Sequence, residues 1–314
     1  MSELLRVEHL KKYFNTKHGV LHAVDDVSFA INRGETLGVV GESGCGKSTL
    51  GRTVLGLLPA TEGKILYDNE DITHMSVHKF RQMRHKMQIV FQDPFSALNP
   101  RMNLRQLIAD PLKTNRVYAD KEAMNRRVRE LMDTVGLAKH ITYAFPHELD
   151  GGRRQRIGIA RALALDPEFI VCDEPVSALD VSIQAQILNL LQDLQEAKGL
   201  TYIFITHDLS VVKHISTDIM VMYVGTLVEK SPAGQLFDNP LHPYTKGLLS
   251  AIPIPEITEK REHSIMQGEI TTPIDPKPGC RFAQRCPHCQ PRCRTETPEL
   301  REVEPGHFVA CHQV

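Results

Sequence analysis

The first residues that could perform chemistry form a glycine-rich segment that ends in a lysine and two hydroxyl residues. Glycine permits backbone angles that other residues avoid, so Gly41, Gly44 and Gly46 let successive N–H groups point toward an anion. Lys47 would then reach the β- and γ-phosphates of a nucleoside triphosphate, and the Ser48 hydroxyl would ligate Mg²⁺. The pattern GxxxxGK[ST] predicts a phosphate-binding loop, and the alternative is a chance glycine turn before a helix. The predicted phosphate-binding residues are Gly41, Glu42, Ser43, Gly44, Cys45, Gly46, Lys47, Ser48 and Thr49.

Two adjacent carboxylates follow an apolar run farther along the chain. The run Phe169–Cys172 predicts a buried strand, and Asp173 and Glu174 come directly after it. Ligands bind at the carboxyl edge of parallel sheets, so Asp173 could hold Mg²⁺, directly or through water, and Glu174 could polarise an attacking water. The alternative is a solvated surface pair, although such pairs seldom follow a wholly apolar run.

A histidine occupies the same position after another predicted strand. The run Tyr202–Ile205 is again apolar, and Thr206 and His207 follow it. His207 could therefore reach the γ-phosphate from the edge of the sheet. A structural histidine is the commoner interpretation of a single histidine at such a place.

Cysteines crowd into the C-terminal part of the chain, which holds five of the seven. Because the protein is expected to be cytoplasmic, this cluster favours a metal site over disulfides. Thiolates suit zinc or an iron–sulfur cluster, and the spacing from Cys286 to Cys289 alone would fit half of a zinc site. The clustered cysteines are Cys280, Cys286, Cys289, Cys293 and Cys311.

The elements that must position these residues alternate between strand and helix. Leu37–Val40 predicts a strand buried on both faces ahead of the glycine-rich loop, and a helix follows from Lys47 to about Leu58. Residues 1–35 alternate apolar and polar side chains, which predicts antiparallel strands with one solvated face. Tyr13 and Phe14 fall in a loop-like stretch between those strands, where they could stack on an adenine ring or simply pack.

Strand patterns disappear from about residue 100 to 165, where charge rises at helical spacing. Helices are predicted over Lys121–Val135, Arg153–Leu165 and, farther on, Val181–Lys198. We predict an α/β P-loop NTPase core with a mostly parallel sheet, an N-terminal antiparallel β-subdomain, a helical subdomain and a small cysteine-rich C-terminal extension. The predicted boundaries are 1–252 for the ATP-binding domain, about 93–165 for its helical subdomain, and 253–314 for a linker and the extension.

Composition limits the possible partners. The formal charge of −1 gives no reason to expect nucleic acid as the main partner. No apolar run approaches the roughly 18–20 residues that a membrane-spanning helix needs. Met1–Arg6 does not have the pattern of a signal peptide. We expect a cytoplasmic protein that docks on a membrane partner.

Taken together and in this order, the motifs resemble those of the ATP-binding subunits of ABC transporters, and the resemblance covers nearly the whole chain. The glycine-rich loop is similar to their Walker A motif, Phe169–Glu174 to Walker B with its catalytic glutamate, and His207 to their switch histidine. Gln92 resembles the Q-loop glutamine, which in that family senses Mg²⁺ and contacts the membrane subunits. The remaining matches are Asp150, Gly151, Gly152 and Arg153 at the signature, Ser177 and Asp180 at the D-loop, and Phe14 at the A-loop with Tyr13 as its alternative.

This resemblance implies an ATPase that works as a dimer. Two ATP-binding domains would meet head to tail, and each ATP would lie between the Walker A loop of one domain and the signature of the other. Ser48, Gln92 and Asp173 would hold Mg²⁺, Glu174 would orient water, and His207 would secure the γ-phosphate. Closing this dimer would drive a membrane pair between inward-facing and outward-facing states.

Finer features are similar to the peptide/nickel branch of ABC importers. They are the segments Val90–Pro100, Asp173–Ser182 and His242–Thr245, and a tail from Pro278 to Cys311. The resemblance implies the second of two non-identical ATPases in a dipeptide or oligopeptide importer, with two integral-membrane permease subunits and an extracytoplasmic binding protein. A nickel or glutathione-like cargo, a soluble ABC ATPase of DNA repair or translation, and an exporter subunit are the alternatives.

The same branch suggests a role for the cysteines. Some of its members carry a [4Fe-4S] cluster on four cysteines that match Cys280, Cys286, Cys293 and Cys311, which would leave Cys289 as an extra. Zinc and free thiols remain the alternatives. The expected role of such a group is to hold together an extension with little core of its own.

The signature departs from the family pattern at two positions. Asp150 stands where a serine is usual, and Arg153 where a glutamine is usual. An ionised aspartate cannot donate a hydrogen bond to a phosphate and would repel it. In one interpretation Asp150 only caps the following helix and Arg153 neutralises it. In the other, the ATP site that pairs this signature with the partner's Walker A loop is catalytically weak.

Overall fold

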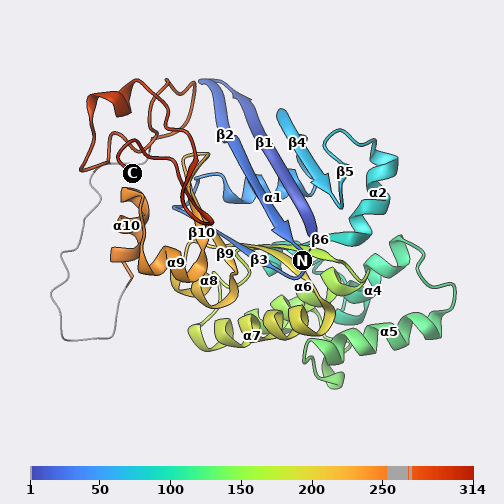
Figure 1. The fold of residues 1–314 in the computed structure, drawn as a ribbon. Helices are drawn as coiled ribbons and strands as arrows, with labels where there is room; N and C mark the ends of the chain where they lie inside the picture. The colour runs from blue at the N-terminus through green and yellow to red at the C-terminus, as the bar shows by residue number, and fades with distance from the viewer. Residues whose placement is uncertain (1, 253–267, 269–270) are drawn as a thin grey trace, which may run out of the picture. The chain divides into compact units, whose positions relative to one another are not determined.

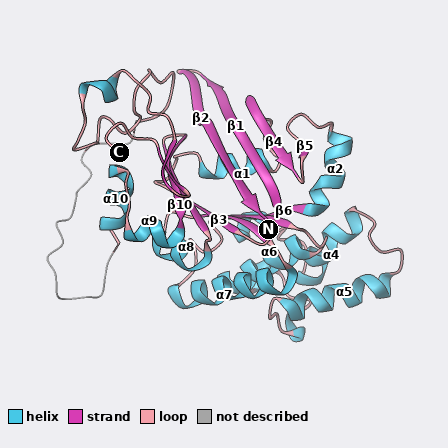
Figure 2. Cartoon of the chain, in the orientation of Figure 1, coloured by secondary structure: helices cyan, strands magenta, loops and turns pink. Residues whose placement is uncertain are grey.

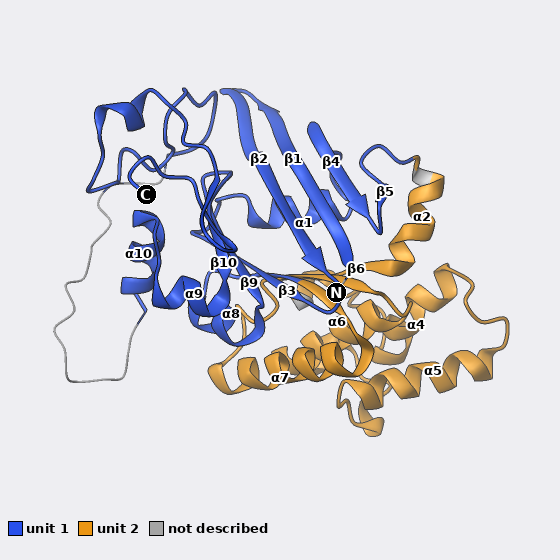
Figure 3. Ribbon diagram, viewed as in Figure 1, with its two compact units in different colours: residues 1–75, 203–314 blue, residues 76–202 orange. Residues whose placement is uncertain are grey.

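The computed structural model describes residues 2–252, 268 and 271–314, which form two compact units. Unit 1 comprises residues 1–75 and 203–314, and unit 2 comprises residues 76–202 (Figure 3). Most of the predicted linker, residues 253–267 and 269–270, lies outside the described residues. No helix in the described ranges is both long and apolar enough to cross a membrane.

Unit 1 begins with an antiparallel sheet in the strand order β2-β1-β4-β5. Its long hairpin joins β1 (Glu3–Thr16) to β2 (Gly19–Asn32), and buried and solvated positions alternate along it, as predicted. The expected loop at Tyr13 and Phe14 is wrong. Both residues lie inside β1, because Tyr13 pairs with His22 and Phe14 with Leu21 across the hairpin. The two shorter strands are β4 (Glu62–Tyr67) and β5 (Glu70–Asp71).

A second group of strands in unit 1 has the order β11-β12-β10-β9-β3. The strand β3 (Thr36–Val40) is buried throughout, as its unbroken apolar run predicts, and it runs parallel to β9 (Asp218–Tyr223). The strands β10, β12 and β11 continue antiparallel from β9. Their bounds are Thr226–Pro232 for β10, Arg301–Glu304 for β11 and His307–Val309 for β12.

Short helices accompany these strands. The helix α1 (Lys47–Val54) begins at the predicted residue but ends before Leu58, because Gly56 adopts a left-handed backbone with φ of 60°. The other helices of unit 1 are α8 (Leu209–Ile215), α9 (Ala233–Asp238), α10 (Pro243–Ser250) and the 3₁₀ turn η3 (Pro291–Arg294).

A buried carboxylate fastens the C-terminal hairpin to β10. Glu229 is fully buried and accepts hydrogen bonds from the ring of His307 at 2.7 Å and from the amides of Leu241 and His242 at 2.7 and 3.0 Å. Such a group is stable inside a protein only when its acceptor sites are occupied. The extension is therefore part of the sheet of unit 1, and Figure 1 draws it in red beside β10.

Unit 2 is mainly helical, as its charge pattern predicts (Figure 2). The helix α6 (Gly151–Leu163) packs against α4 (Leu104–Thr114) and α5 (Lys121–Thr134) through their buried apolar faces. The strands β6 (Met87–Val90) and β7 (Phe169–Asp173) pair in parallel. The remaining elements are α2 (Val77–Lys86), α3 (Pro94–Ala97), η1 (Lys139–Ile141), η2 (Pro146–Glu148), α7 (Val181–Lys198) and, at the boundary between the units, β8 (Thr201–Ile205).

Candidate functional site

The glycine-rich loop joins β3 to α1, and two of its glycines let it approach neighbouring backbone closely. A Cβ atom on Gly41, where φ is 151°, would lie 2.2 Å from the carbonyl oxygen of Met222. A Cβ atom on Gly46, where φ is 104°, would lie 2.1 Å from that of Ala23. Gly44 also has a positive φ, of 79°, but a Cβ atom there would meet nothing within 4 Å. The loop is therefore fixed at both ends and open in the middle, as an anion cradle must be.

The start of α1 supplies donors for such an anion. Gly46 occupies the N-cap position, and no side-chain hydrogen bond caps the helix. The first N–H groups of a helix have no intrahelical partner, and the helix dipole makes them attract negative charge. The described geometry therefore fits a phosphate group at this end of α1.

Lys47 is held inside this loop. Its side chain is buried, and its ammonium donates to the carbonyl oxygens of Gly41 at 2.7 Å and Glu42 at 2.9 Å. Cys45 lies beside it, and burial raises the pKa of that thiol, although Lys47 opposes the rise. Lys47 therefore supplies a positive charge inside the loop, and Cys45 is a neutral packing residue.

His207 is placed near the start of this loop within unit 1. The amide of Thr206 donates to the carbonyl oxygen of Val39 at 3.1 Å, next to the last residue of β3. His207 follows directly and is exposed. The predicted histidine therefore lies at the carboxyl end of β3, where the glycine-rich loop begins.

Tyr13 and Phe14, the two candidates for stacking on adenine, both lie on β1, and the ring of each already contacts another side chain. The ring of Tyr13 stacks on His22 with centroids 3.8 Å apart, and its hydroxyl donates to Asp25. The ring of Phe14 lies 4.7 Å from the ammonium of Lys12. Burial by itself would raise the pKa of Asp25, but the hydrogen bonds from Tyr13 and His22 and the charge of Arg281 lower it overall.

Unit 2 gathers the predicted acidic residues at the carboxyl ends of β6 and β7. Asp173 is buried at the end of β7, and Glu174 follows with a left-handed backbone, φ of 47°. Gln92 comes two residues after β6, and its amide donates to the carboxylate of Glu174 at 2.8 Å. Ser177, in the predicted D-loop, donates to the carbonyl of Glu174. Strained backbone of this kind concentrates at functional sites.

The signature residues begin α6. Asp150 is its N-cap and accepts from the amide of Arg153 at 2.8 Å, while the Arg153 guanidinium lies 3.4 Å from the same carboxylate. A Cβ atom on Gly151 would lie 2.9 Å from the end of the Leu179 side chain, and one on Gly152 would lie 2.7 Å from the Ile183 side chain, so both glycines are closely packed. Asp180 is the N-cap of α7. The capping role expected of Asp150 is therefore present in this fold.

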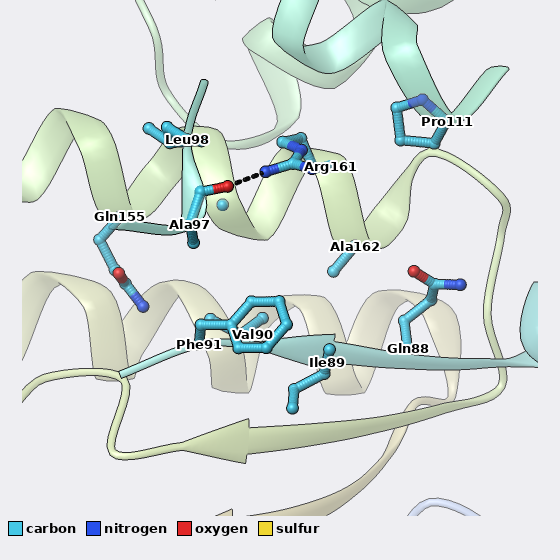
Figure 4. Close-up of a pocket in the computed structure, with 11 residues that line it drawn as sticks. Gln88, Ile89, Val90, Phe91, Ala97, Leu98, Pro111, Gln155, Arg161 and Ala162 are labelled. Carbon is cyan, nitrogen blue, oxygen red and sulfur yellow. Dashed lines mark hydrogen bonds between the residues drawn. The ribbon is translucent and has the colours of Figure 1, made fainter. Parts of the chain in front are cut away.

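A pocket of about 110 Å³ that the sequence did not predict lies beside Gln92, the predicted Q-loop glutamine (Figure 4). One wall is Phe91, which directly precedes Gln92, and the other belongs to α6, where Arg161 donates to the carbonyl of Ala97 at 2.7 Å. Burial lowers the pKa of Arg161. Gln155, also in the lining, is almost fully buried, and its amide nitrogen has no hydrogen-bond partner in the described part of the chain. The available signal in the sequence was a phenylalanine on each side of Gln92, Phe91 and Phe95. In the structure both side chains are exposed.

None of the five C-terminal cysteines forms a disulfide. The amide of Cys280 donates to the carbonyl of Cys293 at 2.7 Å. Burial, and then the neighbouring Cys293, Cys311 and Cys286, raise the pKa of Cys280 to about 11, so its protonated form is favoured. Within the described ranges no group of three or more His, Cys, Asp or Glu side chains is arranged to hold a metal ion. In this arrangement, the described cysteines give no support to the predicted [4Fe-4S] cluster or to zinc.

Two further residues near the loop were not singled out from the sequence. The amide of Glu42 donates to the hydroxyl of Tyr244 at 2.9 Å, and the carboxylate of Glu42 pairs with Arg285 at 2.6 Å. Tyr244 and Arg285 come from segments that the sequence showed only to be similar to the peptide/nickel branch. Their contacts with the loop could be found only in the folded chain.

Comparison with known proteins finds that the chain is similar to ATP-binding proteins of ABC transporters. A family model described as ABC transporter matches residues 24–177, and one described as oligopeptide/dipeptide transporter, C-terminal region, matches residues 228–293. The chain is 51% identical to the oligopeptide transport ATP-binding protein AppF of Bacillus subtilis, over 98% of this chain and 97% of that protein. It is 52% identical to OppF of the same species, over 98% of this chain and 96% of that protein.

Solved structures agree with the family models. The dimeric ATP-binding cassette MJ0796, in a post-hydrolysis state bound to ADP and Pi, matches with a TM-score of 0.68 and 28% identity, over 73% of this chain and 99% of that one. CbiO1 from Clostridium perfringens, part of the transporter complex CbiONQ, matches with a TM-score of 0.68 and 29% identity, over 76% of this chain and 92% of that one.

Replacing Gly46 with alanine should weaken nucleotide binding, because the new Cβ atom would lie 2.1 Å from the Ala23 carbonyl and force the loop to move. We expect the affinity for a fluorescent ATP analogue to fall by more than about tenfold, a free-energy loss above about 1.4 kcal/mol. Gly234→Ala is the control, because a Cβ atom there meets nothing within 4 Å. Wild-type affinity in folded Gly46→Ala protein would show that the loop conformation is not required.

Proposed function

Because this chain belongs to the ATP-binding proteins of ABC oligopeptide and dipeptide transporters, we propose that it powers the uptake of dipeptides or oligopeptides across a membrane. The chain is an ABC ATPase with a phosphate-binding loop in unit 1 and a Walker B carboxylate pair in unit 2. The observation that carries the peptide assignment is the C-terminal match over residues 228–293, since that region characterises oligopeptide and dipeptide transporters. It favours an importer of the peptide/nickel branch over an exporter or a soluble ABC ATPase, and the relatives named as oligopeptide transport proteins favour peptide over nickel as the cargo.

Unit 1 would bind the triphosphate. Lys47 now donates to two carbonyl oxygens of its own loop, and phosphate oxygens would replace them as better acceptors for an ammonium. The uncapped N–H groups of α1 would stabilise the negative charge that develops during phosphoryl transfer. Phe14 or Tyr13 would stack on the adenine, and His207 would secure the γ-phosphate.

Unit 2 would supply the hydrolytic carboxylate. Glu174 would orient the attacking water, and the hydrogen bond from Gln92 holds that carboxylate in place until substrate binds. Ser48, Gln92 and Asp173 would provide the oxygen ligands that Mg²⁺ prefers. When bound, Mg²⁺ supplies positive charge against the β- and γ-phosphates.

The partners follow from the proposed importer. A second, non-identical ATPase would complete each ATP site with its signature, and two permease subunits and an extracytoplasmic binding protein would complete the transporter. A permease subunit would bind at the pocket beside Gln92 and contact the exposed side chains of Phe91 and Phe95. The chain would then lie on the cytoplasmic face of the membrane as a peripheral subunit.

Asp150 would make the two ATP sites of this assembly unequal. Its side chain is 60% exposed at the start of α6, and its ion pair with Arg153, at 3.4 Å, is open to solvent, so its charge is only partly neutralised. A carboxylate about 4 Å from a phosphate charge would oppose binding by roughly 4 kcal/mol at an effective dielectric of 20. We propose that ATP held between this signature and the partner's Walker A loop turns over slowly, while ATP on this chain's own loop is hydrolysed normally.

Replacing Glu174 with glutamine should stop hydrolysis and leave ATP bound. A positioned general base typically contributes about 10²–10⁴-fold, so we expect phosphate release by the assembled transporter to fall by at least about 100-fold. The glutamine keeps the shape of the side chain, so ATP should be retained through gel filtration in a closed dimer. Glu196→Gln, an exposed position on α7, is the matched control. Hydrolysis at the wild-type rate would remove Glu174 from its proposed role.

Replacing Asp150 with serine should raise ATP affinity and turnover at the partner's Walker A loop in the assembled transporter, because a carboxylate is replaced by a hydroxyl donor. Stability should change little, since serine caps a helix about as well as aspartate. Asp120→Ser is the control, because Asp120 also caps a helix, α5, through its side chain. If Asp150→Ser changes neither the ATP affinity nor the turnover at the partner's Walker A loop, Asp150 does not weaken that site and the proposal is wrong.

A metal or cluster on the C-terminal cysteines remains a prediction. If Cys280, Cys286, Cys293 and Cys311 hold a [4Fe-4S] cluster, anaerobically purified full-length protein should contain iron and sulfide in equal amounts and absorb near 400 nm. Zinc in their place would support the alternative. Protein with neither metal would contradict both assignments and leave the cysteines as thiols.

A further inference from the structure

An arginine from the C-terminal extension pairs with the phosphate-binding loop. The two terminal nitrogens of Arg285 lie 2.6 and 3.0 Å from the two carboxylate oxygens of Glu42, in a bidentate pair. The Arg285 side chain is 7% exposed and that of Glu42 is 21% exposed. The hydrogen bond with Glu42 raises the pKa of Arg285. A bidentate pair that is shielded from water is stronger and more directional than a surface ion pair.

Glu42 connects this arginine to the ammonium of Lys47. The carbonyl oxygen of Glu42 accepts from Lys47 at 2.9 Å and from the amide of Cys45 at 3.3 Å. The amide of Glu42 donates to Tyr244. Each backbone group of Glu42 therefore has a fixed partner, and its side chain is held by Arg285. An arginine that fixes Glu42 also fixes the backbone that places Lys47.

Aromatic side chains hold the guanidinium in position. Its carbon lies 5.8 Å from the ring centroid of Tyr223 and 6.0 Å from that of Phe282, within reach of cation–π attraction. The rings of Tyr223 and Tyr244 make an edge contact at 4.6 Å. Arg285 is therefore oriented before any nucleotide binds, which reduces the entropy lost on ordering the loop.

A second arginine keeps the same segment attached independently. Arg281 donates to the carbonyl oxygen of Val224 at 3.1 Å and pairs with Asp25, which in turn accepts from Tyr13 and His22. The pairing of β12 with β10 does not involve Arg285 and should remain when this residue is changed. A substitution at Arg285 therefore removes the contact with the loop without releasing the extension.

We propose that Arg285 is a positioning residue for ATP binding, through which the C-terminal extension controls the phosphate-binding loop of the same chain. It acts in two ways. It fixes the Glu42 backbone that holds Lys47, and it neutralises a carboxylate that would otherwise repel the polyphosphate. The inference rests on the proposed function, because it concerns ATP at this loop.

The test measures the dissociation constant of a fluorescent ATP analogue on the full-length chain. We expect Arg285→Gln to weaken binding by about tenfold, equivalent to about 1.4 kcal/mol. Arg285→Lys keeps the charge without the bidentate geometry, so its affinity should be intermediate. Adding Glu42→Gln to Arg285→Gln removes the unpaired carboxylate, so the double variant should bind more tightly than Arg285→Gln alone. A purely structural role for Arg285 does not predict this recovery.

Controls separate this inference from the assignment of the site. Arg292→Gln breaks an exposed ion pair inside the extension, Arg292–Glu296 at 2.7 Å, and should leave affinity unchanged. Wild-type affinity in Arg285→Gln, or no recovery in the double variant, would overturn the positioning role. Lys47→Ala tests the site itself. If it binds ATP as tightly as the wild type, the proposed ATP site is wrong, and the role of Arg285 falls with it.

Discussion

A buried positive charge is the constraint on which the nucleotide-binding part of this protein depends. The ammonium of Lys47 is almost fully buried, and its hydrogen-bond partners are carbonyl oxygens of its own loop. Neutral carbonyls offset only part of the cost of removing a charge from water. The site therefore favours a polyanion, and the buried strand β3, the glycine turns and the uncapped start of α1 hold the loop in the shape that receives one.

The rigidity of this loop comes from segments that are distant in the sequence. The backbone of Ala23 and Met222 lies so close to Gly46 and Gly41 that no side chain would fit there. Tyr244 and Arg285 complete the surroundings through Glu42. A C-terminal extension that contains few regular elements thus contributes to the site at the other end of the chain, and its cysteines lie in the same segment as Arg285.

The carboxylate of Asp150 affects both the stability of α6 and the proposed binding of a phosphate. Asp150 is an effective N-cap because its carboxylate accepts from the Arg153 amide. In the proposed dimer, the same negative charge would oppose a phosphate. Serine would satisfy the helix equally well, so the requirements of the helix do not explain the choice of aspartate. Helix stability and nucleotide affinity are therefore separate consequences of one side chain.

The sequence by itself determined the phosphate-binding loop, the buried strands on either side of the acidic pair and the helices of unit 2, because contiguous residues and short periodicities encode them. The sequence pattern wrongly predicted a loop at Tyr13 and Phe14, because the residues of one strand do not indicate which strand will pair with it. Arg285 and Glu42 lie 243 positions apart, and neither has a local pattern that predicts the other. Only the tertiary structure decided that contact, because it depends on β12 pairing with β10 and on the aromatic side chains that orient the guanidinium.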